Sequence, residues 1–150
     1  MQIRDQITRT LYAQLARQWD DHKQLMSQLT KEEINGPYVQ LITAAFLEAV
    51  QRRFLKAGQP ASEEEVIDYV ASSRARSDDA AETIDPVIAE KQINVALERL
   101  PPEAMDDVDN NVAFDTQVFL LSLLVADADY TPDQLSEFVE RSRDLAEEFF

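Results

Sequence analysis

One apolar run constrains the fold of this chain more than any other feature. Asn110–Ala126 reads NNVAFDTQVFLLSLLVA, and from Val118 to Ala126 only Ser122 is polar. This run is too short to cross a bilayer, which takes about 20 residues. Leu and Ala outnumber β-branched residues and no Gly or Pro interrupts, so helix is favoured over buried strand. A helix that is apolar on all sides needs other helices around it. We therefore predict a central core helix at about 110–126.

Helix-start signals recur along the rest of the chain. Thr30 with Glu33 and Thr131 with Gln134 have the spacing of capping boxes, as does Ser62 with Glu65. Proline suits the first position of a helix, and three prolines stand at such places: Pro37, Pro86 and Pro132. Gly58 predicts the end of a second helix that runs from Pro37 to Ala57. The fold class we predict is all-α, as a single-domain bundle of five main helices, with room for a short sixth, around the central helix.

The first thirty residues predict a long amphipathic helix at residues 3–29. A continuous helix of that length would measure about 40 Å at 1.5 Å per residue, longer than a small domain is wide. It must therefore break near Asp20–Asp21, or project and pair with another helix. Its apolar stripe alternates in steps of three and four residues, and the stripe defines our candidate interface: Tyr12, Leu15, Trp19, His22, Met26 and Leu29.

Near the middle of the chain, SDDAAET at residues 77–83 contains no large apolar side chain. This composition predicts a mobile acidic loop at about 77–84, within one domain that spans residues 1–150.

The charge of the chain is negative and unevenly spread. The net charge is −15, with +2 over residues 1–57 and −17 over residues 58–150. Such a field repels nucleic acid and anionic membranes and favours a basic partner. We expect no nucleic-acid and no membrane partner. Cysteine is absent and the N-terminal residues lack a signal-peptide pattern, so we expect a cytoplasmic protein. Ten Arg against four Lys, with eighteen Ala, are typical of a GC-rich bacterial genome.

Several kinds of chemistry are excluded by the residues that the chain lacks. Gly36 and Gly58 lie too far apart for a phosphate-binding loop. His22 is the only histidine, which excludes a histidine-rich zinc site. Asp107, Asp109 and Asn111 have EF-hand spacing, but the Gly and Glu that complete such a loop are missing. We therefore expect no catalytic residue, no metal ligand and no cofactor.

One enzymatic alternative remains open from the sequence. The predicted helices at 63–76 and 132–148 both carry carboxylates at helical spacing: Glu64, Glu65 and Asp68 on the first, Glu137, Glu140 and Asp144 on the second. If the two faces converged, they could hold Mg²⁺ as a metal-dependent all-α nucleotide pyrophosphohydrolase does. First-turn acids and solvated helix faces explain the same residues without a ligand.

By elimination, the sequence favours a non-enzymatic acidic helical protein that acts through protein–protein association. The partner is either a second copy, in a homodimer, or a basic protein. Tyr, Trp and Met, which interfaces favour, occur on the N-terminal stripe. Protonation of His22 within that stripe would weaken pairing at about pH 5.5.

Overall fold

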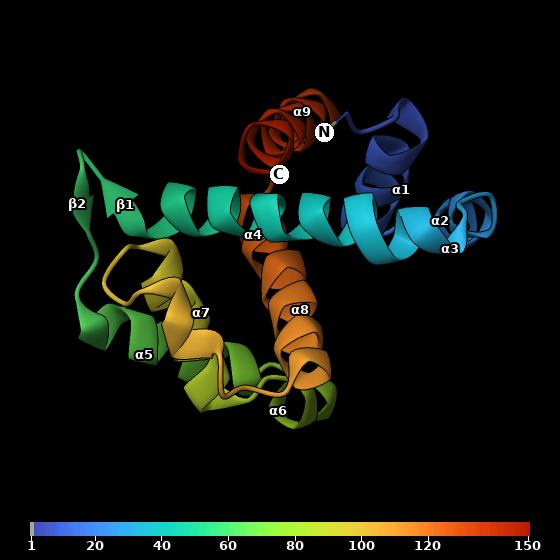
Figure 1. Ribbon diagram of the computed structural model, residues 1–150. Coiled ribbons are helices and arrows are strands. Elements are labelled where there is room, and N and C mark those ends of the chain that lie inside the picture. Colours follow the sequence, from blue (N-terminus) through green and yellow to red (C-terminus); the bar gives the residue numbers. More distant parts are fainter. Residues whose placement is uncertain (1) are drawn as a thin grey trace. The chain divides into compact units, whose positions relative to one another are not determined.

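The computed structural model describes residues 2–150, and they are helical apart from one short hairpin (Figure 1). The predicted all-α class is confirmed. The chain divides into two compact units, each described here by itself. Unit 1 comprises Met1–Glu48 with Val125–Phe150, and unit 2 comprises Ala49–Leu124.

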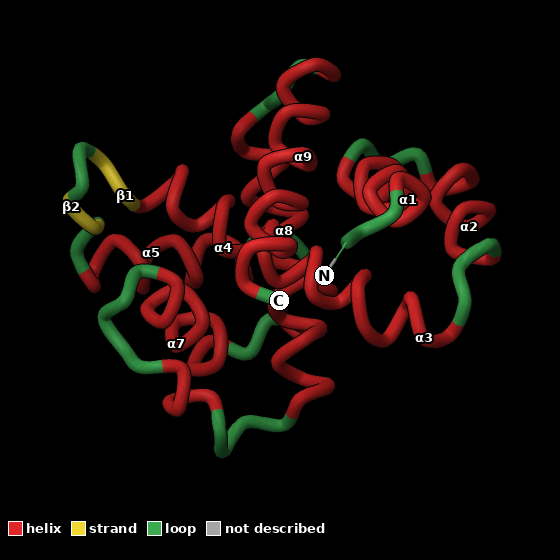
Figure 2. Tube along the Cα trace, turned by 45° about the horizontal axis from the view of Figure 1, so that its top comes forward, coloured by secondary structure: helices red, strands yellow, loops and turns green. Residues whose placement is uncertain are grey.

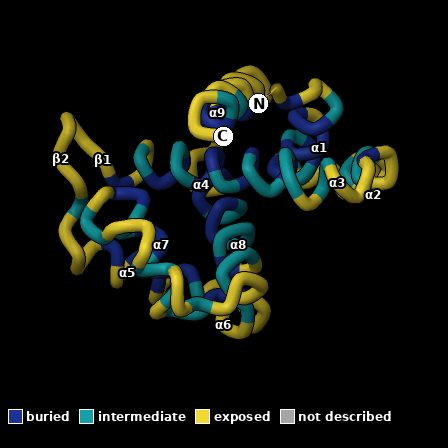
Figure 3. The backbone as a smooth tube through the Cα atoms, viewed as in Figure 1, coloured by how far each residue is buried: buried dark blue, intermediate teal, exposed yellow. Residues whose placement is uncertain are grey.

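Unit 1 is built from the two ends of the chain. Helix α1 lies between α2 and α9 (Figures 1 and 2). The described elements of the unit are α1 (Asp5–Leu15), α2 (Trp19–Ser27), α3 (Lys31–Glu33), η1 (Ile34–Tyr38), the start of α4 (Val39–Phe54) and α9 (Pro132–Phe149). Helix α9 is strongly amphipathic: Leu135, Phe138 and Leu145 are buried while its opposite face is exposed (Figure 3).

The predicted helix at 3–29 is two helices, and the break lies before Asp20–Asp21. Arg17 has a φ of 59°, in the left-handed region. The Gln18 N–H donates to the Ala13 carbonyl at 2.9 Å and the Arg17 N–H to the Gln14 carbonyl at 3.2 Å. This is the Schellman pattern, in which a left-handed residue ends a helix and satisfies its last carbonyls. The chain therefore turns back on itself, and α2 packs against α1.

The segment that follows α2 stays helical where a break was predicted. Thr30 and Glu33 form the predicted capping box. Instead of ending at Asn35–Gly36–Pro37, the chain continues through the π-helical turn η1 into α4. A π turn shifts the hydrogen bonding by one residue, and Pro37 has no N–H to leave unpaired there.

Helix α4 ends earlier than predicted, at Phe54 instead of Ala57. The next residues form a tight antiparallel hairpin of β1 (Leu55–Lys56) and β2 (Gln59–Pro60), drawn as the two yellow segments in Figure 2. Its turn residues Ala57 and Gly58 both have positive φ, 52° and 78°. Two such residues match the twist of flanking strands, as in a type I′ turn. Gly58 thus turns a hairpin and does not cap a helix.

Unit 2 also contains a helix where a loop was predicted. Its elements are the end of α4, the β hairpin, α5 (Glu63–Arg74), α6 (Asp78–Thr83), α7 (Pro86–Ala96), η2 (Pro102–Met105) and most of α8 (Asn110–Ala128). The segment 77–84 contains α6, which begins where the Ser77 hydroxyl accepts from the Ala80 N–H at 3.0 Å. Ala80 is fully buried, and Arg74 donates to the Ala81 and Ile84 carbonyls. These contacts hold the segment in place.

Helix α8 confirms the predicted central helix as an element, with bounds at Asn110–Ala128. Burial is concentrated in its second half, where Leu120, Leu121, Leu124 and Val125 are buried. The apolar run is not covered on every side, since Phe119 and Leu123 remain partly exposed. Within residues 2–150, α8 is the one helix long and apolar enough to cross a membrane by length and composition, and 28% of that span is buried in protein.

The division into units redistributes the charge seen along the sequence. Unit 1 has seven basic and fourteen acidic residues, a net charge of −7. Unit 2 has seven basic and fifteen acidic residues, a net charge of −8. The slightly basic front of the sequence therefore does not become a basic unit. Arg52, Arg53 and Lys56 fall in unit 2, which leaves residues 1–48 with a net charge of −1, and residues 125–150 add a further −6.

Burial of α8 can be tested by truncating one side chain. Leu121 is 1% exposed, so Leu121→Ala should lower the free energy of unfolding by about 2–5 kcal/mol, through lost apolar contact and the cavity left behind. Val112, on the same helix, is 40% exposed, and Val112→Ala should cost less than about 1 kcal/mol. Urea unfolding followed by circular dichroism measures both changes. Equal, small losses would contradict the burial of Leu121.

Candidate functional site

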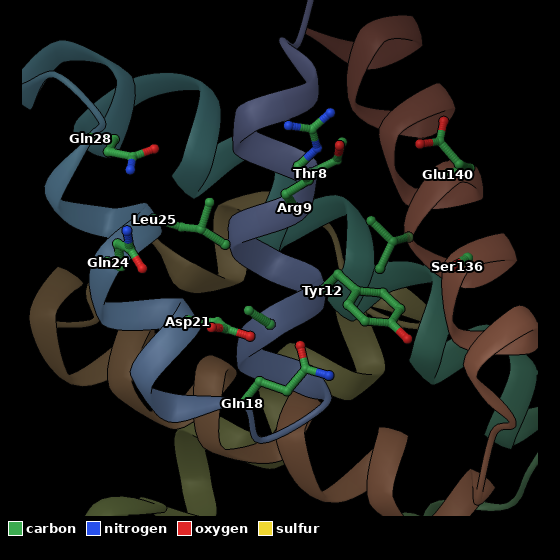
Figure 4. A pocket seen from close by; sticks show the side chains of 12 residues that line it. Thr8, Arg9, Tyr12, Gln18, Asp21, Gln24, Leu25, Gln28, Ser136 and Glu140 are labelled. Atoms are coloured by element: carbon green, nitrogen blue, oxygen red, sulfur yellow. The ribbon is translucent and has the colours of Figure 1, made fainter.

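Unit 1 has an open groove of about 560 Å³ along α1, between α2 and α9 (Figure 4). We call it the unit 1 groove. Its apolar lining comes from all three helices: Tyr12 and Ala13 of α1, Leu25 of α2 and Val139 of α9. Tyr12 reaches from α1 toward α9, and Leu25 reaches from α2 toward α1 (Figure 4). Ala13 and Val139 are buried, while Tyr12 and Leu25 are partly exposed. The groove therefore has an apolar floor with accessible side chains above it.

Polar groups line the same groove. Asp21 of α2 and Glu140 of α9 contribute carboxylates from opposite walls, and Arg9 contributes one guanidinium from α1. Gln18, Gln28 and Ser136 add neutral groups that can both donate and accept hydrogen bonds. Glu140 lies 3.7 Å from Arg143, a loose contact on an exposed surface. The lining thus combines an apolar floor with two acidic walls.

Hydrogen bonds hold the α2 wall against α1. The His22 ring Nδ1 lies 3.1 Å from the Thr10 carbonyl, and Gln6 donates to the Gln28 side chain at 2.5 Å. A carbonyl only accepts, so Nδ1 carries the proton in this bond. This hydrogen bond joins α2 to α1.

A further side-chain hydrogen bond joins α1 to η1. The Tyr38 hydroxyl donates to the Gln14 side-chain oxygen at 2.6 Å. Burial raises the pKa of Tyr38 well above its usual range, so the hydroxyl stays protonated and keeps its role as donor.

On the opposite wall, Arg143 of α9 holds the start of the chain. It donates to Asp5 at 2.8 Å and to the Ile3 carbonyl, while the Ile3 N–H donates to Glu147 at 2.7 Å. Burial lowers the pKa of Arg143, but the hydrogen bond to Asp5 and the charges of the nearby carboxylates outweigh it and raise the pKa above its usual value. α9 thereby pairs with both backbone polar groups of Ile3, which fixes α9 beside α1.

The predicted candidate interface is divided by the turn at Arg17. Leu15 and Leu29 are buried within the chain, so they have no surface to offer a partner. His22 and Met26 are partly exposed. Tyr12 lies in the unit 1 groove, and Trp19 lies outside its lining. The six residues therefore do not form one continuous exposed stripe.

Trp19 is the member of that stripe with the largest exposure. Its side chain is 58% exposed at the start of α2, with the His22 ring edge-on to it at 6.5 Å between ring centroids. Gln18 and Asp21 line the groove, whereas Trp19 does not. Exposed indoles are typical of the anchor residues of protein interfaces.

The carboxylates of the enzymatic alternative belong to different units. Those at Glu64, Glu65 and Asp68 lie on α5 of unit 2, and those at Glu137, Glu140 and Asp144 lie on α9 of unit 1. In the described part of the chain, no three His, Asp or Glu side chains gather as a metal-ion site requires. Catalysis by these carboxylates stays a prediction.

The EF-hand-like segment has a structural role at the start of a helix. The Asp109 carboxylate accepts from the Asn111 and Val112 N–H groups at 2.9 and 3.1 Å, at the start of α8. Thr131 forms the predicted capping box with Gln134 at the start of α9.

The α9 wall of the groove was missing from the predicted site. Ser136, Val139 and Glu140 lie more than a hundred positions along the chain from α1, and periodicity within one helix carries no information on which distant helix will pack beside it. The one signal for this wall was the amphipathic pattern of 132–149, which shows that α9 buries one face but not against which partner.

Comparison with protein-family models, with curated proteins and with solved structures gave no match for this chain.

The ion pair between Arg4 and Glu33 gives a pH-dependent stability. Arg4 Nε donates to Glu33 at 2.7 Å, and this bond, followed by the backbone N–H of Thr30, holds the pKa of Glu33 below its usual 4.5. A carboxyl whose pKa is lowered by folding stabilises the fold at pH values above its unfolded-state pKa. That stabilisation is lost as the pH falls through the lowered pKa of the folded state. Wild type should therefore exceed Glu33→Gln in unfolding free energy at neutral pH, and the difference should shrink below about pH 4.5.

Thermal unfolding between about pH 7 and pH 3 measures this difference. The control is Glu32→Gln, which makes the same change in net charge at the preceding residue of the same first turn. A difference between wild type and Glu33→Gln that stays constant over the whole range would contradict the role of the ion pair.

Proposed function

We propose that this chain is a non-enzymatic protein that acts by associating with another protein through unit 1. The observation that carries the proposal is Trp19, an indole that is 58% exposed at the start of α2. Burying a tryptophan removes a large apolar area from water, so its exposure in the isolated chain leaves that stabilisation for a partner to supply.

The charge of the chain favours a basic partner over a second copy. Both units are acidic, at −7 and −8, so two copies repel each other at long range while a basic protein is attracted. The absence of cysteine supports a cytoplasmic setting, where disulfides are rare.

Site-specific photo-crosslinking in the host cell tests the proposal. A benzophenone amino acid at position 19 should give one discrete adduct on irradiation, because Trp19 contacts the partner. The control position is Val87, which is 62% exposed in unit 2 and should give none. An adduct of twice the chain mass of 17.1 kDa identifies a second copy, and any other discrete mass identifies a foreign protein. No adduct at position 19, or equal adducts at both positions, would contradict the proposal.

A further inference from the structure

The unit 1 groove has the form and charge of a helix-binding site. We propose that it takes an amphipathic helix of a basic partner protein, with the apolar face of that helix on α1 and its basic side chains against the two acidic walls. This inference rests on the proposed function and adds which structural element of the partner is bound, where it lies and which residues select it.

The groove suits a helix because its lining comes from three helices, between which a further helix can pack. α1 forms the floor, and α2 and α9 form the walls (Figure 4). Gln18 and Gln28 line the α2 wall and are ten residues apart, so this wall runs roughly 15 Å, or about three turns of a bound helix. Amphipathic helices bind such grooves with anchors spaced at three and four residues. A pocket for a small molecule would enclose its ligand, whereas this groove is open to solvent.

The floor offers apolar contacts to the helix. Tyr12 and Leu25 are partly exposed in the lining, and Ala13 and Val139 are buried in it. Leucine-sized side chains on a bound helix would lie between Tyr12 and Leu25 and above Ala13, whose small side chain leaves room there. Covering Tyr12 and Leu25 in this way supplies the apolar part of the binding energy.

The walls select the charge of the helix. Asp21 and Glu140 face the groove from α2 and α9, so basic side chains on the two flanks of the helix would each meet one carboxylate. Arg9 is the one basic group in the lining, and it can pair with an acidic residue at one end of the bound helix. A second copy fits this pattern poorly as a whole molecule, since each of its units carries a net negative charge.

Fluorescence anisotropy with synthetic peptides tests the proposal on the full chain. The first peptide is a labelled amphipathic helix of about 18 residues, with leucines on one face and lysines on both flanks. The second has glutamates in place of the lysines, and the third has the composition of the first in an order without amphipathic spacing. We expect binding of the first peptide alone, weakening as salt is raised.

Charge-reversal variants locate the binding site. Asp21→Lys should weaken binding of the lysine peptide at least about fivefold, as should Glu140→Lys, and together they should allow the glutamate peptide to bind. The controls are Asp20→Lys and Asp144→Lys, which make the same charge changes on the same helices at exposed residues outside the lining. Each control should weaken binding less than about twofold, because salt screens the effect of a more distant charge. Ser136→Phe, at an exposed residue of the α9 wall, should block the groove while the chain keeps its helical circular dichroism.

The outcomes separate this inference from the proposed function. Equal weakening by Asp20→Lys and Asp21→Lys would show attraction to the acidic chain as a whole, and the groove assignment would be wrong. It would also be wrong if the scrambled peptide bound as well as the amphipathic one, or if Ser136→Phe bound normally. If wild type binds none of the peptides while the crosslink from position 19 persists, the helix proposal fails and protein association stands.

Discussion

The turn at Ala16–Gln18 is the constraint on which the arrangement of unit 1 depends. Arg17 has a left-handed backbone conformation at a position where glycine is usual. The hydrogen bonds from the Gln18 and Arg17 N–H groups to the last carbonyls of α1 stabilise this conformation. Without the turn, α2 would continue away from α1, and the α2 wall of the groove would not exist. The turn also separates Trp19 from the buried stripe and leaves it at the surface. One backbone conformation thus creates the α2 wall of the groove and leaves Trp19 exposed.

Much of the helix pattern could be predicted because it depends on local chemistry. Thr30 with Glu33 and Thr131 with Gln134 form capping boxes, Asp85 caps the helix that starts at Pro86, and α8 lies where the apolar run predicted it. The turn at Arg17 could not be predicted, since apolar periodicity continues through it and a left-handed arginine leaves no mark in the sequence. Helix α6 was missed for a different reason. Ser77 is a good cap, but the helix Asp78–Thr83 buries only Ala80, too little apolar area to show as a helix face in the sequence.

The candidate site was predicted only in part because it joins distant segments. Tyr12 comes from the predicted stripe, whereas Val139 and Glu140 come from the other end of the chain. Arg143 and Glu147 hydrogen-bond to the backbone of Ile3 and so join the two ends of the chain. In the sequence, these polar residues look the same as those on any solvated helix face. The distribution of charge along the sequence also failed to predict the charge of the folded units. Arg52, Arg53 and Lys56 fall in unit 2 and acidic α9 belongs to unit 1, so a basic front never forms. One of the α9 acids, Glu140, lines the groove, and we propose that it helps to select a basic helix.

The central claim is that the unit 1 groove binds the helix of a partner, and backbone NMR of the full chain tests it most directly. The lysine-flanked amphipathic peptide would be titrated into ¹⁵N-labelled protein and the amide shifts followed residue by residue. The account predicts the largest changes at groove residues of all three helices, among them Tyr12, Leu25 and Val139. Shifts centred instead on unit 2, around the exposed apolar residues Ile67 and Val87, would contradict it.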